Sequence, residues 1–157
     1  MREVERIEDQ LQRAFAGEAW HGPSVLEIIE DITREQAAAR PLAGAHSIWE
    51  LVLHIAAWER AIVSRLSGDR AQLTAHEDWP RVAATTEEAW QHTKQILSQG
   101  HHELRTAIAG LDESRLDQPI IEGMSSVYVT LHGILQHYLY HAGQIALLKK
   151  AVLEGEQ

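Results

Sequence analysis

The sequence contains no cysteine and only a few prolines. Among its 157 residues there are 4 Pro and 10 Gly. Without cysteine, the chain can form no disulfide, offer no thiolate to a metal and supply no thiol nucleophile of its own. The low proline and glycine content excludes collagen-like and low-complexity classes. Because this length is enough to bury a continuous core, we expect a single folded domain over residues 1–157.

Basic side chains and long apolar runs are also scarce. The chain has 14 Lys and Arg against 23 Asp and Glu, a formal net charge of −9. This charge repels phosphate backbones and anionic lipid, so we expect no nucleic-acid partner. No apolar run approaches the roughly 20 residues that span a membrane, and the first residues, MREVERIEDQL, lack the apolar core of a signal peptide. A cytoplasmic protein with no membrane partner is therefore expected.

Apolar residues recur at intervals of three and four along four long segments, as they do in amphipathic helices. No convincing alternation of apolar and polar residues suggests a strand. The sequence thus predicts an all-α fold, a four-helix bundle with short extra helices in the connections. The long helices are expected at residues 2–16, 48–66, 86–109 and 127–152.

Helix starts are marked by Ser or Thr followed three residues later by Glu or Gln. Gly100 interrupts the third long helix and is expected to bend it. Residues 68–84 show no sustained period and are predicted to form a long connection, a type of segment that often acts as a lid or binding loop. The capping pairs are Ser24 with Glu27, Thr33 with Gln36, Ser47 with Glu50, and Thr85 with Glu88.

Two histidines lie four residues apart in the last predicted helix. On a helix, His137 and His141 stand one turn apart on the same face, with Cβ atoms about 6 Å apart. Two imidazoles at this spacing can share one metal ion, but a third ligand must come from another helix. His54 is the candidate, because its apolar neighbours indicate that it faces inward, where an unpaired imidazole is costly.

Each of these residues also has an ordinary structural interpretation. Histidine pairs at this spacing occur by chance on exposed faces, and a buried histidine such as His54 is often satisfied by a carbonyl or carboxylate. Gly133, one turn before His137, either leaves room for a ligand or serves close helix packing. Gln144 either supports an imidazole or substrate, or is a solvated polar residue.

Two residues of the second predicted helix complete the candidate site. Glu50, one turn before His54, can orient an imidazole or act as a base. In the alternative interpretation its carboxylate only closes the helix cap with Ser47. Trp58, one turn after His54, is a candidate neighbour of the metal or the substrate.

The segments HSIWELVLHIAAWE and LHGILQHYLYHAGQIALLKK, with the pattern H-x-x-x-H-x-G-Q, resemble the DinB-like superfamily. This superfamily is named for damage-inducible bacterial proteins and includes thiol-dependent S-transferases. The resemblance implies a four-helix bundle, often a homodimer, with a three-histidine site for a divalent ion such as zinc or nickel. Carried over by motif, the ligands are His54, His137 and His141. The other histidines do not match and are expected at the surface or in loops: His21, His46, His76, His92, His101, His102 and His132.

Three protein ligands leave an open coordination position, where water is expected at rest. Iron and manganese also suit such a site, since nitrogen donors discriminate poorly among divalent metals. We therefore expect a metal-dependent enzyme acting on a small molecule, by S-transfer from a low-molecular-weight thiol or by hydrolysis. One alternative is a non-catalytic module that binds metal or a small molecule. Another is an interaction protein that forms a dimer. Candidates for its contact surface are Trp20, Trp49, Trp79 and Trp90, although most of these are expected in the core.

Overall fold

Every regular element of the protein is a helix. The computed structural model describes residues 1–155, and within them no strand forms; Pro119 and Ser126 make only an isolated bridge. The predicted all-α class is confirmed. In chain order the elements are α1 (Glu3–Ala16), α2 (Val25–Ile29), α3 (Arg34–Ala38), α4 (Ile48–Leu66), α5 (Ala75–Asp78), α6 (Glu87–Ala109), the 3-10 turn η1 (Glu113–Arg115) and α7 (Val127–Gly155).

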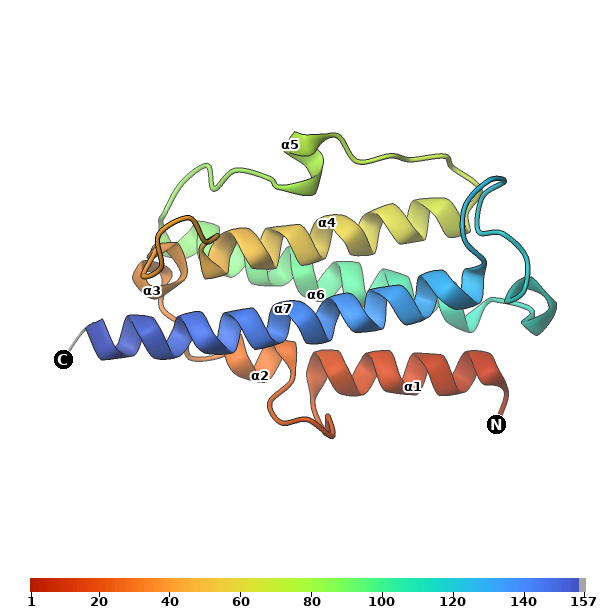
Figure 1. The fold of residues 1–157 in the computed structure, drawn as a ribbon, viewed down its shortest axis with the longest axis horizontal. Coiled ribbons are helices and arrows are strands. Elements are labelled where there is room, and N and C mark those ends of the chain that lie inside the picture. Colours follow the sequence, from red (N-terminus) through yellow and green to blue (C-terminus); the bar gives the residue numbers. More distant parts are fainter. Residues whose placement is uncertain (156–157) are drawn as a thin grey trace.

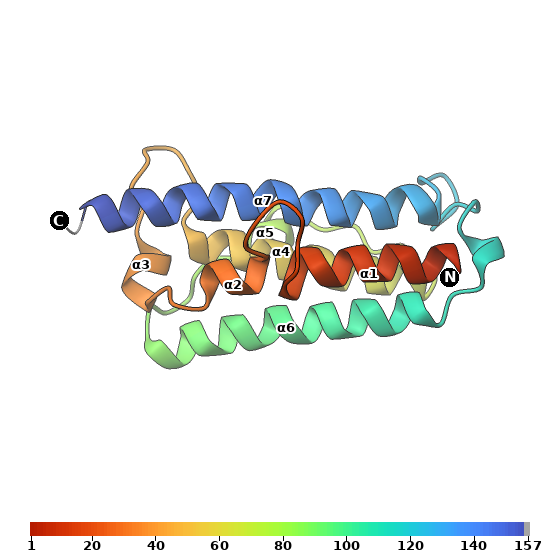
Figure 2. The same ribbon diagram turned by 90° about the horizontal axis from the view of Figure 1, so that it is seen from below.

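The four longest helices, α1, α4, α6 and α7, lie side by side as a bundle (Figures 1 and 2). Both α4 and α1 pack against α6 and α7. In Figure 1, α1 and α7 run in one direction while α4 and α6 run in the other. Among the described residues, no helix combines the length and the apolar character that crossing a bilayer requires.

Two of the candidate surface tryptophans belong to the core. The Trp90 indole donates to the Ile32 carbonyl (2.8 Å), and the Trp49 indole donates to Thr93 Oγ1 (2.9 Å). Both rings are buried with their polar atoms satisfied, as buried tryptophans usually are. Trp20, by contrast, is fully exposed.

Three of the four predicted helix caps form as expected. The side chains of Ser24, Thr33 and Ser47 each accept a hydrogen bond from a backbone N–H of the first turn. For α6 the prediction was wrong by one residue, since Thr86 rather than Thr85 is the cap and accepts from Ala89. Adjacent threonines offer the same chemistry, so the pattern alone cannot choose between them. The helix also continues without a break past the glycine expected to interrupt it.

The connection between α4 and α6 is a long crossover. Because these helices run in the same direction, the chain must return along α4, whose 19 residues span about 28 Å. Midway it forms α5, capped by Thr74, which accepts from the Glu77 amide while the Glu77 carboxylate accepts from Thr74. A long connection was expected over residues 68–84, and short extra helices were expected in the connections, but the Thr74–Glu77 cap was not among the predicted ones. The crossover lies against α4 and brings Asp78 and Trp79 to its middle.

Candidate metal centre

Three imidazoles from two helices meet on one side of the bundle interior. His54 comes from α4, and His137 and His141 come from successive turns of α7. Nε2 of His137 lies 2.9 Å from Nε2 of His54 and 3.0 Å from Nε2 of His141. One ligand atom from each ring lies within 4.8 Å of the others. The helical spacing of the pair and the inward position of His54 together produce this cluster.

Hydrogen bonds at the far side of two rings orient them. His54 Nδ1 donates to the Asp78 carbonyl (2.7 Å) and lies 3.1 Å from Asp78 Oδ1. His141 Nδ1 donates to Gln144 Oε1 (2.6 Å). Since a neutral imidazole carries a single N–H, these bonds leave the Nε2 lone pairs of His54 and His141 directed at the cluster. Such support of the second ring nitrogen is typical of metal-ligating histidines.

Burial favours the neutral form of the two rings on α7. It lowers the pKa of His137 to about 3, and the neighbouring His141 and His54 lower it further. Burial also lowers the pKa of His141. A single N–H on His137 Nε2 can satisfy only one of the two Nε2 lone pairs that face it at a time, whereas one divalent ion can bind all three nitrogens. Within residues 1–155, His137 Nδ1 is also buried without a partner. This donor set of three imidazole nitrogens fits a divalent ion.

The crossover supplies two neighbours of the cluster that the sequence analysis missed. The Trp79 ring stacks on His54 (centroids 3.9 Å apart, 5° between planes) and, on its other face, on His46 (3.6 Å, 6°). Asp78 holds His54 and also accepts from the Trp58 indole (2.7 Å). The overlooked Thr74–Glu77 cap was the available signal, because it starts the short helix that ends at Asp78.

A family model described as the DinB superfamily matches residues 19–145. This match covers most of the chain and includes His54, His137 and His141. The chain belongs to the DinB superfamily. No curated protein and no solved structure gave a match.

In this DinB-superfamily chain, Glu50 takes the structural alternative considered for it. Its carboxylate accepts from the Ser47 amide (2.8 Å), pairs with Arg40 and lies 3.5 Å from His46. Burial alone would raise the pKa of Glu50, but the Ser47 hydrogen bond and the Arg40 charge hold it below its ordinary value. The orienting role considered for Glu50 falls instead to Asp78 and Gln144.

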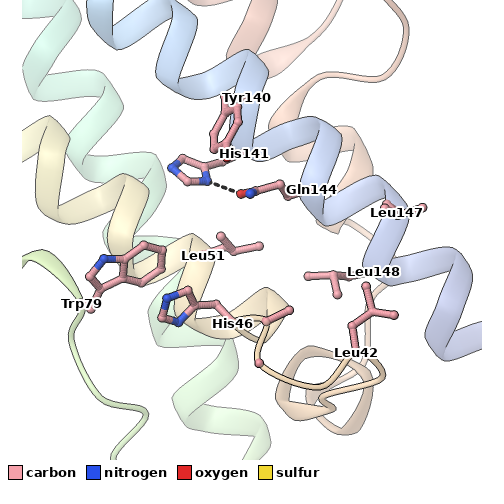
Figure 3. A pocket seen from close by; sticks show the side chains of 11 residues that line it. Leu42, His46, Leu51, Trp79, Tyr140, His141, Gln144, Leu147 and Leu148 are labelled. Carbon is pink, nitrogen blue, oxygen red and sulfur yellow. Dashed lines mark hydrogen bonds between the residues drawn. The ribbon is translucent and has the colours of Figure 1, made fainter.

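Pockets open on two sides of the histidine cluster. The larger, about 470 Å³, is lined by His141, Gln144 and apolar side chains (Figure 3). The smaller, about 270 Å³, lies beside His137 and is lined by Trp58 and Gly133. A Cβ at Gly133 would meet no atom within 4 Å, so this glycine leaves open space rather than serving close helix packing.

His101 was expected at the surface, and this expectation was wrong. The ring is buried and stacks on Phe15 (centroids 3.7 Å apart, 5° between planes). Its Nδ1 lies 3.2 Å from the Tyr138 hydroxyl, which donates to Glu59 Oε1 (2.6 Å). The sequence analysis had not considered Glu59. These three residues form a second buried polar group, the Glu59 cluster.

Proposed function

We propose that this DinB-superfamily protein binds one divalent metal ion through His54, His137 and His141 and is a metal-dependent enzyme of the S-transferase or hydrolase type. Zinc and nickel are the first candidates, with iron and manganese as further ones. The observation that carries the proposal is the convergence of three Nε2 atoms, two of them from rings whose Nδ1 atoms donate elsewhere. A divalent ion held there would supply a Lewis acid able to ionise a thiol or a water near neutral pH.

The surrounding residues support such chemistry in separate ways. Asp78 and Gln144 fix the orientation of His54 and His141. Trp79 covers one face of His54 and keeps water from it. Three protein ligands leave a coordination position for a substrate. Because the chain has no cysteine, the sulfur of an S-transfer must come from a small-molecule thiol.

Metal binding is tested on protein purified without nickel resin. Elemental analysis should find about one divalent ion per chain after loading. Replacement of any one ligand, for example His54→Ala, should weaken zinc affinity by at least about 100-fold in calorimetry. His92→Ala, on the exposed side of α6, is the matched control and should bind as the wild type does. Unchanged zinc affinity in all three ligand variants would refute the site.

Activity is tested separately on the loaded protein. Bacillithiol, mycothiol or glutathione is combined with 1-chloro-2,4-dinitrobenzene, and 4-nitrophenyl acetate tests hydrolysis. We expect a rate in one assay that chelation removes and that His141→Ala lacks. A loaded protein inactive in both assays would favour the non-catalytic alternative. The ligands come from α4 and α7, so an ion would then act by tying these helices together.

A further inference from the structure

The larger pocket is apolar and contains no charged lining residue. Leucines and the rings of Tyr140 and Trp79 form its wall, while His46, His141 and Gln144 supply the polar atoms (Figure 3). None of the Asp, Glu, Lys or Arg residues within 1–155 lines it. A charged ligand would lose its hydration there without gaining a counter-ion from the lining side chains, which is costly. The lining therefore favours a neutral, apolar molecule that reaches the histidine cluster at His141.

The smaller pocket differs in having a charged lining residue, because Arg65 lines it together with Ser125 and Thr130. The Arg65 side chain is partly buried; its Nε donates to the Ala71 carbonyl (3.0 Å), and its guanidinium carbon lies 5.4 Å from the centre of a Trp58 ring. These contacts leave the two terminal nitrogens of the guanidinium without a hydrogen-bond acceptor in residues 1–155.

Arg65 also lacks an ion-pair partner. Although the chain carries an excess of acidic residues, no carboxylate of the described residues lies within ion-pair distance of Arg65. An unpaired guanidinium with its terminal N–H groups available is suited to a carboxylate, which accepts two parallel hydrogen bonds from it. Since His137 lines the same pocket, an anion held by Arg65 lies beside the histidine cluster.

We propose that the three-histidine centre serves two separate ligand pockets, a neutral apolar one beside His141 and a carboxylate-selective one beside His137 that depends on Arg65. This inference rests on the proposed function for the role of the two ligands. It favours two-substrate transfer over hydrolysis. In such a transfer the thiol sulfur forms a bond to an electrophilic carbon of the apolar ligand, whose leaving group departs with its electron pair, and the thiol proton passes to solvent.

The carboxylate pocket is tested with two thiols that differ only in charge, 3-mercaptopropionate and 3-mercaptopropionamide. Calorimetry on zinc-loaded protein should show that Arg65→Gln weakens binding of the carboxylate by about tenfold and leaves the amide unchanged. Arg70→Gln is the matched control, because Arg70 is exposed and pairs with Glu122 outside the pocket. An equal carboxylate-to-amide ratio in wild type and Arg65→Gln would overturn the inference.

The apolar pocket is tested with the neutral fluorescent dye N-phenyl-1-naphthylamine. Leu147→Glu, at the exposed rim, should weaken dye binding by about tenfold, since the new charge must lose hydration. It should leave 3-mercaptopropionate binding unchanged. Leu153→Glu, exposed on the same helix but outside the lining, is the control and should have no effect.

Whether the two pockets are independent is tested by titrating 3-mercaptopropionate in the presence of increasing dye, up to saturation. Separate pockets leave its Kd unchanged, whereas a Kd that rises in proportion to the dye concentration means one shared site and refutes the inference. Both thiols are also titrated against chelator-treated protein. If the protein failed to bind zinc but still bound the carboxylate thiol through Arg65 and the dye in the apolar pocket, only the proposed function would be contradicted. If the protein bound zinc but neither variant changed the binding of its ligand, only the two-pocket inference would be contradicted.

Discussion

Two buried polar clusters lie along α7, and they differ in what completes them. His137 belongs to the histidine cluster and the next residue, Tyr138, belongs to the Glu59 cluster, because successive helical residues point in different directions. In the histidine cluster, the Nε2 lone pairs of His54 and His141 both face Nε2 of His137. The Glu59 cluster instead has a hydroxyl between a carboxyl group and an imidazole. The first therefore offers a position for an added positive ion, whereas the second is held together by hydrogen bonds among the protein's own groups.

Burial disfavours charge on two members of the Glu59 cluster. Burial raises the pKa of Glu59 well above its ordinary value and lowers the pKa of His101 to about 3. The Tyr138 hydroxyl donates to Glu59 Oε1, and His101 Nδ1 lies 3.2 Å from its oxygen. Burial of histidine thus does not by itself identify a metal site. The two clusters differ in the atoms that face one another, which are three imidazole nitrogens in one and a carboxyl group, a hydroxyl and an imidazole in the other.

Adding metal should give the largest difference between variants of the two clusters. At 1,000 times its dissociation constant, zinc should raise the free energy of unfolding of the wild type by about 4 kcal/mol. His54→Ala should lose this stabilisation, while Tyr138→Phe should keep it, because Tyr138 offers no ligand to the cluster. Urea denaturation with zinc and with chelator measures both. A Tyr138→Phe protein that no longer responds to zinc would show that the two clusters are coupled.

In metal-free protein, a substitution in the Glu59 cluster should have the larger effect on the free energy of unfolding. Tyr138→Phe should lower the free energy of unfolding by about 2 kcal/mol, since Glu59 Oε1 and the His101 ring lose a buried partner. Tyr128→Phe, at an exposed position of the same helix, should change it by less than about 0.5 kcal/mol. Urea midpoints in chelator give both values. Equal effects at the two tyrosines would mean that the Glu59 cluster contributes nothing to stability.

The features that the sequence predicted are those decided by residues close together in the chain. The caps at Ser24, Thr33 and Ser47 were found because a cap is decided within four residues. The three histidines were singled out from helical spacing and from the family resemblance. The roles of Asp78 and Trp79 were not, because they depend on the path of a crossover, which follows from helix directions that periodicity does not contain.

The Glu59 cluster was missed although its signal was present. His101 follows Leu97 by four residues and precedes Leu104 by three, which places it on the buried stripe of α6. Glu59 likewise lies four residues after Ile55, on the inward side of α4. Both polar residues were overlooked because inward positions were assigned to apolar side chains. The single domain and the homodimer stay predictions.

A smaller effect sharpens the comparison through pH. The folded pKa of Glu59 is raised above its unfolded value of about 4.5, so the folded state holds a proton that the unfolded state releases. Stability from this group is therefore complete below pH 4.5 and falls as pH rises. Relative to the wild type, the free energy of unfolding of Glu59→Gln should increase by up to about 1.4 kcal/mol for each pH unit above 4.5, until the folded pKa of Glu59 is reached.

Urea denaturation from pH 5 to 8 in chelator measures this difference. The groups whose charge acts on Glu59 are Arg60, which lowers its pKa, and Glu103, which raises it. Subtracting the wild-type curve removes the contribution of the histidines, which are the same in both proteins. Glu122→Gln, at an exposed position, should give a flat difference. A flat difference for Glu59→Gln as well would mean that Glu59 is ionised in the folded protein.

The smallest expected effect lies at Gly100, where α6 passes Glu59. At an exposed helical position, glycine to alanine stabilises by about 1 kcal/mol, and Gly143→Ala, with nothing within 4 Å of the new Cβ, should do so. At Gly100 the Cβ would lie 2.5 Å from Glu59 Oε2, which is buried and has no hydrogen-bond partner in the described chain. Gly100→Ala should therefore show no gain in urea denaturation, and combining it with Glu59→Ala should restore about 1 kcal/mol. If Gly100→Ala alone stabilised as much as Gly143→Ala, the Glu59 carboxyl group would be free to move aside, and its contact with α6 would not limit the side chain at position 100.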